Sequence, residues 1–418
     1  MSKFLFIASD YKPKTGGIAA YLDSLAKGLI QIGNSVNVLG VISPEDKQRQ
    51  AFLESYEPWV SPFPVLYDKR PNYWLGNSFV SVLEMLRCSS LVARRFLDGT
   101  PFFRSSSEAT LQLRRFLAEY KPDMIVFGHL DLHQYPFALL LKERGFPFGI
   151  IAHDFEVHRF PGKPNDLFRR GMMLKEASWI AANSRHTKSL LEKWNISANK
   201  LKVIYPPISI EAMDASFALK SCTRIGPVLN IASVCRLVRA KGIDVAIRAL
   251  RILSDRKIPY KYVIAGDGNE RECLEALVDE LGLRDSIHFA GQITDADKWH
   301  LLSSSHIFVM PSRVDPQIQH EGFGIALIEA AAFGVPGIGS SEGGIPEAII
   351  DGETGLLVPQ ESPEQLADAL CFLHSHPNEL CGMGRRARER ARRQFDPMTV
   401  AKLFQEAVMK GSEQLVLQ

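Results

Sequence analysis

The sequence predicts two doubly wound α/β domains. The chain has 418 residues, which is too long for one ordinary hydrophobic core, so we expect two domains of roughly 200 residues each. Short apolar runs alternate with amphipathic stretches of helical length, and this alternation occurs twice along the chain. The apolar runs are hydrophobic almost throughout, which indicates strands buried on both faces, as in a parallel sheet covered by helices.

In the first half, the strands are predicted at residues 4–8, 35–41, 124–127, 148–152, 179–182 and 201–205. The helices between them are predicted at 18–32, 106–120 and 187–194. Residues 43–105 are rich in Pro, Phe and Tyr, and we expect loops and short helices there rather than an ordered series of strands.

The second half repeats the alternation, with strands predicted at 228–234, 260–265, 287–290, 307–310, 335–338 and 356–358. Its helices are predicted at 243–255, 270–281, 294–303, 324–333 and 363–374, and a last helix at about 399–409. The Arg-rich run 385–393 is typical of a solvated helix face, and a site for an anionic partner is the alternative. A domain boundary is expected after Tyr205-Pro206-Pro207, because two prolines cannot continue a β-ladder.

The composition excludes several classes of protein. Hydrophobic residues make up 46% of the chain and charged residues 23%, so disorder and collagen-like repeats are excluded. No apolar run approaches the roughly 20 residues that cross a bilayer, and the run 4–8 is too short for the apolar core of a signal peptide. The six cysteines are scattered singly, as expected for buried thiols in a reducing compartment. We therefore expect a cytoplasmic protein.

The charge is distributed unevenly along the chain. Residues 1–207 contain 27 Lys and Arg against 19 Asp and Glu, whereas residues 208–418 contain 22 against 28. A basic first half suggests an anionic surface or acceptor facing it. The alternative is that the two halves attract each other, and both remain open because exposed charges are screened beyond about 8 Å at physiological salt.

Two glutamates carry the first chemical signal. Glu321 and Glu329 are eight residues apart, and glycines flank only the first, at Gly322 and Gly324. If a helix begins near Gly324, Glu321 lies in the loop before it and Glu329 lies about 7 Å along its axis. Backbone N–H groups at the glycines and the helix amino terminus favour a phosphate, and the carboxylates favour paired hydroxyls. This pattern suits a nucleotide sugar, although two glutamates on a helix are also commonplace.

Cations and a second glycine turn support an anionic ligand. Arg236 and Lys241 follow the first strand of the second domain, where the carboxyl ends of strands hold ligands in doubly wound sheets. The alternative is that both are surface residues at the start of a helix. Gly16 and Gly17 follow the first strand of the first domain and offer free backbone N–H groups.

These motifs, in this order, resemble the family 4 retaining glycosyltransferases. The resemblance covers nearly the whole chain and is strongest in 228–360. The motifs that carry it are Gly16-Gly17, Arg236…Lys241-Gly242, Gly266-Asp267-Gly268, Pro311-Ser312, Glu321-x7-Glu329 and Gly343-Gly344-Ile345-Pro346-Glu347. It implies the glycosyltransferase B fold, with two facing Rossmann-like domains at 1–207 and 208–396. It also implies that the donor is held mainly by the second domain and that the segment 397–418 returns to the first.

The resemblance also assigns roles to residues. It implies that Arg236 and Lys241 neutralise the donor diphosphate, that Glu321 contacts sugar hydroxyls and that Glu329 holds the ribose hydroxyls. His153, which follows a first-domain strand, resembles the active-site histidine beside the sugar, with a structural core histidine as the alternative. The remaining expected donor-binding residues are Gly16, Gly17, Gly266, Phe323, Gly324 and Ile325.

One departure concerns the segment 313–320, which separates Ser312 from Glu321 and is longer than in many family members. We expect this loop to affect sugar selectivity. The identity of the hexose therefore stays open.

Metal sites and other enzyme classes are less favoured. Asp295-Ala296-Asp297 matches a D-x-D motif, but acidic residues are ordinary at the start of the helix predicted there. His129-x-Asp131-x-His133 could put three ligands on one face if extended, but contact with an acceptor or a structural role is favoured over a metal site. The lone Gly266-Asp267-Gly268 lacks the third glycine of a dinucleotide site. No lysine is identified for pyridoxal phosphate, and we predict neither a metal nor a cofactor.

We therefore predict a retaining, metal-independent hexosyltransferase. Its donor is expected to be a UDP-hexose, with glucose one candidate, and its acceptor a lipid-linked molecule or a polysaccharide; no nucleic acid is expected. The departing phosphate is expected to help take the acceptor proton. A basic patch could place the first domain at an anionic membrane surface, and its residues are Arg94, Arg95, Phe96, Phe102, Phe103 and Arg104. The alternative function is a non-catalytic, two-lobed nucleotide-sugar-binding protein.

Overall fold

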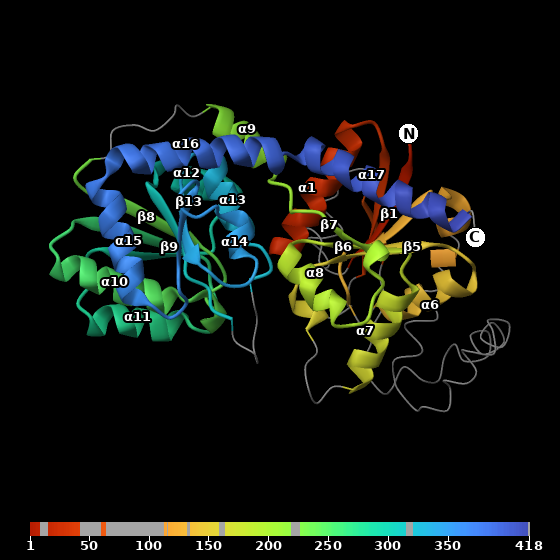
Figure 1. Cartoon of the computed structure of the whole chain (residues 1–418), viewed down its shortest axis with the longest axis horizontal. Coiled ribbons are helices and arrows are strands. Elements are labelled where there is room, and N and C mark those ends of the chain that lie inside the picture. Colours follow the sequence, from red (N-terminus) through yellow and green to blue (C-terminus); the bar gives the residue numbers. More distant parts are fainter. Residues whose placement is uncertain are drawn as a thin grey trace.

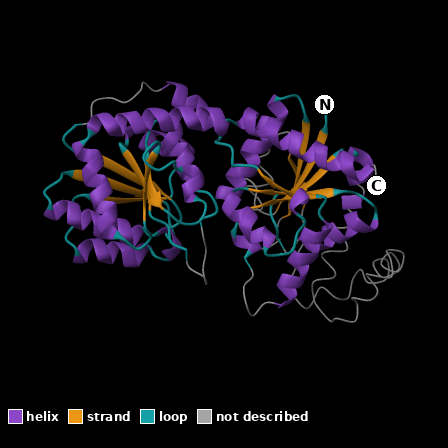
Figure 2. Cartoon of the chain, viewed as in Figure 1, coloured by secondary structure: helices purple, strands orange, loops and turns teal. Residues whose placement is uncertain are grey.

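Two parallel sheets, each covered by helices, form the protein (Figures 1 and 2). The computed structural model describes residues 1–8, 16–41, 60–63, 113–114, 116–131, 134–158, 164–218, 226–314 and 321–416. The strand orders are β3-β2-β1-β4-β5-β6-β7 in a seven-stranded sheet and β10-β9-β8-β11-β12-β13 in a six-stranded sheet. Every strand pair in both sheets is parallel. The prediction of two doubly wound α/β sheets is therefore confirmed.

The strands of the first sheet are β1 (Lys3–Ala8), β2 (Ser35–Val41), β3 (Val60–Phe63), β4 (Met124–Phe127), β5 (Phe148–Ala152), β6 (Trp179–Ala182) and β7 (Leu201–Val203). The helices around it are α1 (Gly17–Gln31), α6 (Tyr135–Glu143), α7 (Pro164–Glu176), α8 (Arg185–Glu192) and α17 (Pro397–Val416). Two apolar clusters cover its faces, one containing residues of α6, α7 and α8 and the other residues of α1 and α17. Buried strands between two such layers explain why their sequences are apolar throughout.

The strands of the second sheet are β8 (Leu229–Val234), β9 (Tyr260–Ala265), β10 (Ile287–Gly291), β11 (Ile307–Met310), β12 (Gly337–Ser340) and β13 (Gly355–Val358). Its helices are α9 (Ile210–Ala218), α10 (Ile243–Asp255), α11 (Arg271–Glu280), α12 (Asp295–Ser304), α13 (Ile325–Ala332), α14 (Ile345–Ala348), α15 (Pro363–Ser375) and α16 (Pro377–Gln394). Residues of α10, α11 and α15 cover one face and residues of α9, α12 and α13 the other.

The chain passes between the two sheets twice, and the two passages touch. The first lies between β7 and α9 and the second between α16 and α17, whose succession is visible in Figure 1. The Ile208 N–H donates to the Phe395 carbonyl at 2.8 Å, which joins the passages. Beyond this point α17 packs on the first sheet, where the Phe404 ring lies 6.3 Å from Phe4 and 5.5 Å from Trp179.

Three sequence expectations need correction. The strand predicted at 335–338 is β12 at Gly337–Ser340, because Pro336 has no N–H to donate and the Val335 N–H is bonded to the Ala330 carbonyl of the preceding helix. The strand β3 lies inside 43–105, where no strand series was expected, and the rest of that stretch lies outside the described residues. Among the described cysteines, Cys273 is exposed and Cys381 is disulfide-bonded, so the expectation of buried thiols fails at these two positions, whereas Cys235, Cys273 and Cys371 are free thiols.

The Arg-rich run 385–393 lies on α16, and part of it is structural rather than solvated. Arg390 donates to the carbonyls of Glu347 at 2.5 Å and Ala348 at 2.6 Å, and its guanidinium lies 5.1 Å from the centroid of the Phe395 ring. Burial lowers the pKa of Arg390 from its ordinary value.

No helix among the described residues is long and apolar enough to cross a membrane.

Candidate active site between the two domains

The predicted site residues follow the carboxyl ends of the central strands. In each sheet the strand order reverses once, between β1 and β4 and between β8 and β11, and ligands bind at such points in doubly wound folds. Gly17 follows β1, Lys241 follows β8 and Glu321 follows β11. The topology therefore gathers residues that are hundreds of positions apart in the sequence.

The loop before α13 touches the first domain at two places. A Cβ on Gly17 would lie 3.6 Å from the Ile325 side chain. A Cβ on Gly322 would lie 2.8 Å from Asp154 Cβ and 3.1 Å from Asn183 Nδ2, which is too close for any residue larger than glycine. The two sheets therefore meet through their carboxyl edges, with the Gly322 loop between them.

Lys241 and Glu321 form an ion pair across two loops. The Lys241 ammonium donates to Glu321 Oε2, and the two side chains are 18% and 15% exposed, so the pair is reachable from solvent. Arg236 is exposed on the same loop as Lys241. Burial raises the pKa of the neighbouring Cys235 to about 11, which keeps its thiol protonated and unreactive.

Arg313 ties the Lys241 loop to the end of β11. Its N–H donates to the Ala240 carbonyl at 2.9 Å, and its guanidinium donates to the Arg239 carbonyl at 3.0 Å and to Asp244 at 2.9 Å. The side chain is only 6% exposed. Sequence reasoning missed Arg313, which was counted with the loop 313–320; residues 315–320 lie outside the described structure.

The start of α13 is built from glycine and a buried phenylalanine. Gly324 is the N-cap with φ +94°, a conformation that side chains with a Cβ rarely adopt. Phe323 is 1% exposed. Its ring centroid lies 5.3 Å from that of Tyr205, in the first passage between the domains, and 5.6 Å from that of Phe395, in the second. Behind this turn, the Gly344 N–H donates to the Glu321 carbonyl at 2.8 Å.

Glu329 lies at the second turn of α13 and is 5% exposed. Lys298 of α12 donates to its Oε1 at 3.1 Å. Burial raises the pKa of Glu329, and the Lys298 charge opposes that rise. Burial alone would lower the pKa of Lys298, but the carboxylates of Glu329 and Asp295 overcome this and raise it. Glu329 therefore pairs with Lys298 and Glu321 with Lys241, so the two glutamates have different cations, and the sequence did not reveal Lys298 as a partner.

The other two predicted donor-binding glycines differ in their surroundings. Gly16 is the N-cap of α1 with φ +147°, and no atom of the described residues lies within 4 Å of the position that its Cβ would occupy. Gly266 has φ +128°, and a Cβ there would overlap the Cys235 carbonyl. Close packing against the Cys235 carbonyl is therefore sufficient to explain why position 266 is a glycine. At Gly16, by contrast, the described residues leave space at the amino terminus of α1.

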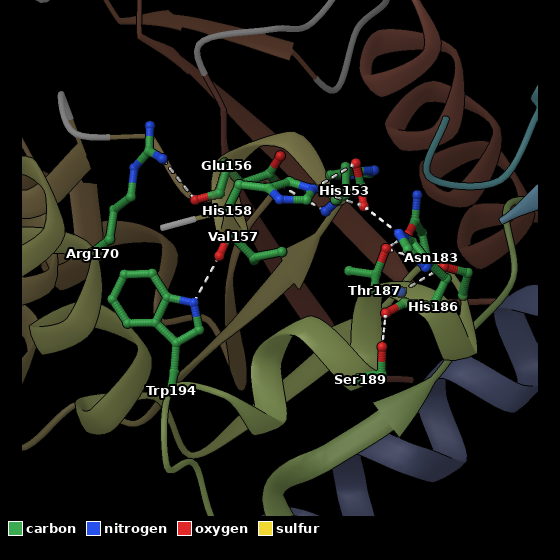
Figure 3. A network of polar contacts seen from close by, with 12 residues as sticks. His153, Glu156, Val157, His158, Arg170, Asn183, His186, Thr187, Ser189 and Trp194 are labelled. Carbon is green, nitrogen blue, oxygen red and sulfur yellow. Dashed lines mark hydrogen bonds and ion pairs between the residues drawn. The ribbon is translucent and has the colours of Figure 1, made fainter. Parts of the chain in front are cut away.

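His153 lies at the end of β5 inside a polar network (Figure 3). Its Nε2 donates to the Gly128 carbonyl at 2.9 Å, and its main-chain N–H donates to Glu156 Oε1 at 2.7 Å. The Tyr21 ring meets the imidazole edge-on at 5.0 Å between centroids. The side chain is held on the first-domain side of the Gly322 loop, since the His153 carbonyl lies 3.4 Å from a Cβ on Gly322.

Asp154, the residue after His153, was not among the site residues predicted from the sequence. It is fully buried with φ +68°, and its carboxylate lies 3.3 Å from His158 Nε2 and 3.1 Å from His186 Nε2. Burial alone would raise the pKa of Asp154, but the two histidines beside its carboxylate lower it. A strained, fully buried carboxylate beside the predicted active-site histidine is a feature to test.

Glu347 links the second domain to a helix of the first. Its carboxylate accepts the N–H groups of Arg185 at 2.8 Å and His186 at 2.9 Å, while Ser184 accepts the next N–H, from Thr187. The amino terminus of α8 is therefore capped in part by the opposite domain.

The two candidate metal motifs have other partners. Thr294 caps α12 by accepting the Asp297 N–H at 3.2 Å, and Asp295 lies 3.3 Å from Lys298. His129 Nε2 lies 3.6 Å from Asp131 Oδ2, and His133 lies outside the described residues. Within the described ranges, no group of three or more His, Cys, Asp or Glu side chains is arranged to hold a metal ion. The patch Arg94–Arg104 also lies outside them.

The chain is similar in sequence and in fold to known proteins. A GDP-mannose-dependent alpha-(1-6)-phosphatidylinositol monomannoside mannosyltransferase of Mycobacterium tuberculosis is 26% identical over 400 residues, which is 93% of each chain. A relative of Escherichia coli, named for colanic acid biosynthesis, is 28% identical over 273 residues, and the chain spans 65% of its length. The crystal structure of Anabaena HepE in complex with UDP-glucose has a TM-score of 0.72 at 19% identity, covering 98% of this chain and 100% of that one.

Two family profiles cover the two halves. The profile described as Glycosyltransferase Family 4 matches residues 15–212, and the profile described as Glycosyl transferases group 1 matches residues 228–393. The fold is therefore the glycosyltransferase B fold. The chain belongs to glycosyltransferase family 4, whose members are retaining transferases that use a nucleotide-sugar donor.

Proposed function

We propose that this enzyme moves a hexose from a UDP-sugar to a lipid-linked or polysaccharide acceptor, without a metal ion. The observation that carries the proposal is the solvent-reachable Lys241–Glu321 pair beside the Gly322–Gly324 turn, where both sheets present their carboxyl edges. A cation, a helix amino terminus and a carboxylate at one place suit a sugar diphosphate, since the first two attract phosphate and the third accepts sugar hydroxyls.

The division of roles follows from charge and position. We assign Lys241 and the exposed Arg236 to the diphosphate, and Glu321 to hydroxyls of the transferred sugar. On this assignment the Lys241–Glu321 pair of the free enzyme opens when the donor enters, because the ammonium then faces phosphate. The N–H groups of Phe323, Gly324 and Ile325 face the same anion at the start of α13, and Gly16 and Gly17 approach it from the first domain.

Leaving-group stabilisation is the main catalytic task on this proposal. As the glycosidic bond breaks, negative charge grows on the diphosphate, and fixed cations and backbone N–H groups lower the energy of that state. We assign these tasks to Lys241, Arg236 and the α13 terminus. The released phosphate oxygen then helps take the proton of the acceptor hydroxyl on the same face of the sugar, which gives retention.

The acceptor is assigned to the first domain. His153 lies on that side of the Gly322 loop, and its Nε2 is fixed on the Gly128 carbonyl, so its ring orientation is set before any substrate binds. The basic composition of residues 1–207 and the names of the two relatives, one for a phosphatidylinositol monomannoside and one for colanic acid biosynthesis, support an acceptor at an anionic, cytoplasmic membrane surface.

One experiment identifies which nucleotide the donor carries. The Anabaena structure contains UDP-glucose, and the mycobacterial relative uses GDP-mannose. We would measure thermal stabilisation of the protein by UDP, GDP, UDP-glucose, UDP-galactose and GDP-mannose, followed by nucleotide release with lipid-linked acceptors. We expect stabilisation by UDP-sugars and acceptor-dependent release of UDP. Selective stabilisation by GDP-mannose would overturn the choice of base, and binding without release in the presence of acceptors would favour the non-catalytic alternative.

A further inference from the structure

Lys298 stands apart from the residues that the proposed function employs. It lies one turn into α12, which follows the carboxyl end of β10 at the edge of the second sheet. Its ammonium lies 3.1 Å from Glu329 Oε1, 3.3 Å from Asp295 Oδ1 and 4.1 Å from the centroid of the Trp299 ring. Its side chain is 17% exposed, so a strongly hydrated cation has been moved largely out of water.

We propose that Lys298 is a positioning residue for the donor: it keeps the Glu329 carboxylate ionised and oriented to accept the ribose hydroxyls. This inference rests on the proposed function and on the ribose-binding role that the family resemblance implies for Glu329, which we adopt here.

Glu329 needs such a partner because of where it lies. The helix α13 reads IALIEAAA, so Glu329 is the one polar side chain among apolar neighbours, and it is 5% exposed. A carboxyl in such surroundings tends to take up a proton unless a cation lies beside it. A protonated carboxyl would be a weaker acceptor, because hydrogen bonds from hydroxyls to an ionised oxygen are about twice as strong as neutral ones.

The geometry leaves one carboxylate oxygen for a ligand. Lys298 donates to Oε1, and within the described parts of the chain no hydrogen bond reaches Oε2. The charged groups that act on the Glu329 carboxyl are Lys298, which favours its ionised form, and Asp295, which opposes it. Asp295 is 74% exposed and Lys298 lies between the two acids, so the lysine decides the balance.

The alternative is a purely structural ion pair joining α12 to α13. The two roles differ in one measurable quantity, the selectivity for ribose hydroxyls. We define this selectivity as the ratio of Kd for the 2′-deoxy or 3′-deoxy nucleoside diphosphate to Kd for the ribose form. A structural pair changes stability and overall affinity, whereas a positioning residue changes this ratio.

The experiment is calorimetric titration with UDP, 2′-deoxy-UDP and 3′-deoxy-UDP, or with the GDP set if GDP binds. For the native protein we expect a ratio of about tenfold or more for at least one hydroxyl, as for hydrogen bonds to charged groups. Lys298→Met should bring that ratio close to one, as should Glu329→Gln, whereas Lys298→Arg should keep most of it. Lys298→Arg also keeps the test decisive if the methionine variant does not fold.

Lys27→Met is the matched control. Lys27 is 14% exposed and also pairs with two acids, Asp23 at 3.1 Å and Glu211, but it lies on α1 with none of the donor-site residues as a partner. This variant loses an equally enclosed ammonium, and we expect its hydroxyl ratio to equal that of the native protein. A drop in the ratio in this control would show that the ratio follows stability, which would overturn the inference.

A pH series separates ionisation from packing. Without Lys298 the pKa of Glu329 rises further, so the hydroxyl ratio of Lys298→Met should be lower in an acidic buffer than in an alkaline one. A ratio that stays low at both pH values would overturn the proposed control of ionisation.

The outcomes also distinguish this inference from the proposed function. If Glu329→Gln lowers the hydroxyl ratio and Lys298→Met does not, the inference is wrong and the ribose assignment stands. If Glu329→Gln leaves the hydroxyl ratio unchanged, Glu329 does not bind the ribose, and the inference about Lys298 is wrong as well.

Discussion

Lys241 and Glu321 come from loops that follow different strands, β8 and β11, and yet form one ion pair at the meeting of the two domains. We predict that Lys241→Ala lowers kcat by about 10²–10³-fold, because the departing diphosphate loses a fixed cation. Steady-state rates with saturating donor measure this. Arg239→Ala is the control, since Arg239 is exposed in the same short 3₁₀ turn, and it should keep near-normal kcat. Near-normal kcat in Lys241→Ala would contradict the assignment.

Asp154 leads to a prediction about pH. Its pKa is lowered from 3.8 in the folded protein, so it stabilises the fold at pH values above the unfolded pKa, and this contribution is lost as the pH falls through the folded one. Asp154→Asn should lower the free energy of unfolding by about 1–3 kcal/mol at neutral pH. The difference from the native protein should shrink below about pH 4.

Urea denaturation at several pH values tests the Asp154 prediction. Asp285→Asn is the control, because Asp285 is exposed. Its unfolding free energy should follow that of the native protein across the whole pH series. An Asp154 difference that is independent of pH would show that shape rather than charge is responsible.

The sequence identified the residues that follow central strands, because strand ends can be read from apolar runs. It did not identify Lys298 or Arg313, whose roles depend on partners in other helices and loops. Lys298 contacts Glu329 from a position 31 residues away, and Arg313 contacts Asp244 from 69 residues away. A single lysine or arginine on a predicted helix or loop gives no sign of such a partner.

The loop 321–325 of the second domain contacts the first domain. We predict that Gly322→Ala raises KM for the donor and lowers kcat, because the added Cβ would lie 2.8 Å from Asp154 Cβ and force the loop away from the first domain. Gly226→Ala, at an exposed glycine where no atom of the described part of the chain lies within 4 Å of the added Cβ, should leave both constants unchanged. Unchanged donor KM in Gly322→Ala would show that the loop need not dock.

At the level of elements, strand positions were predicted well and the exceptions have local causes. The strands at 35–41, 124–127, 148–152, 179–182, 260–265 and 307–310 have the predicted bounds. Buried parallel strands consist of continuous apolar residues, which makes them visible in the sequence. β12 begins later because of Pro336, and α9 lies in the stretch 208–226, which has no clear strand alternation and for which no helix was predicted. The site loops could be located but not oriented, since their shape depends on glycine contacts with distant backbone.

For the whole molecule, we propose that residues 1–207 with 397–418 and residues 208–396 move as two bodies. Glu347 then acts as a latch that holds the two bodies together, because its carboxylate accepts N–H groups at the amino terminus of α8 in the opposite body. We predict that Glu347→Ala lowers the free energy of unfolding by about 1 kcal/mol, as for loss of a helix cap, and increases the radius of gyration in solution scattering. Glu342→Ala, an exposed residue of the same segment, should change neither. An unchanged radius in Glu347→Ala would rule out the latch.

The hydrogen bond from the Ile208 N–H to the Phe395 carbonyl places the entrance and the exit of the second sheet at one spot. The chain therefore enters and leaves the unit formed by that sheet and its helices at one place, as in a domain inserted into another. Replacing 208–395 by the corresponding stretch of a relative requires new junctions at only this spot. Such chimaeras could exchange the nucleotide sugar while leaving the receiving molecule the same.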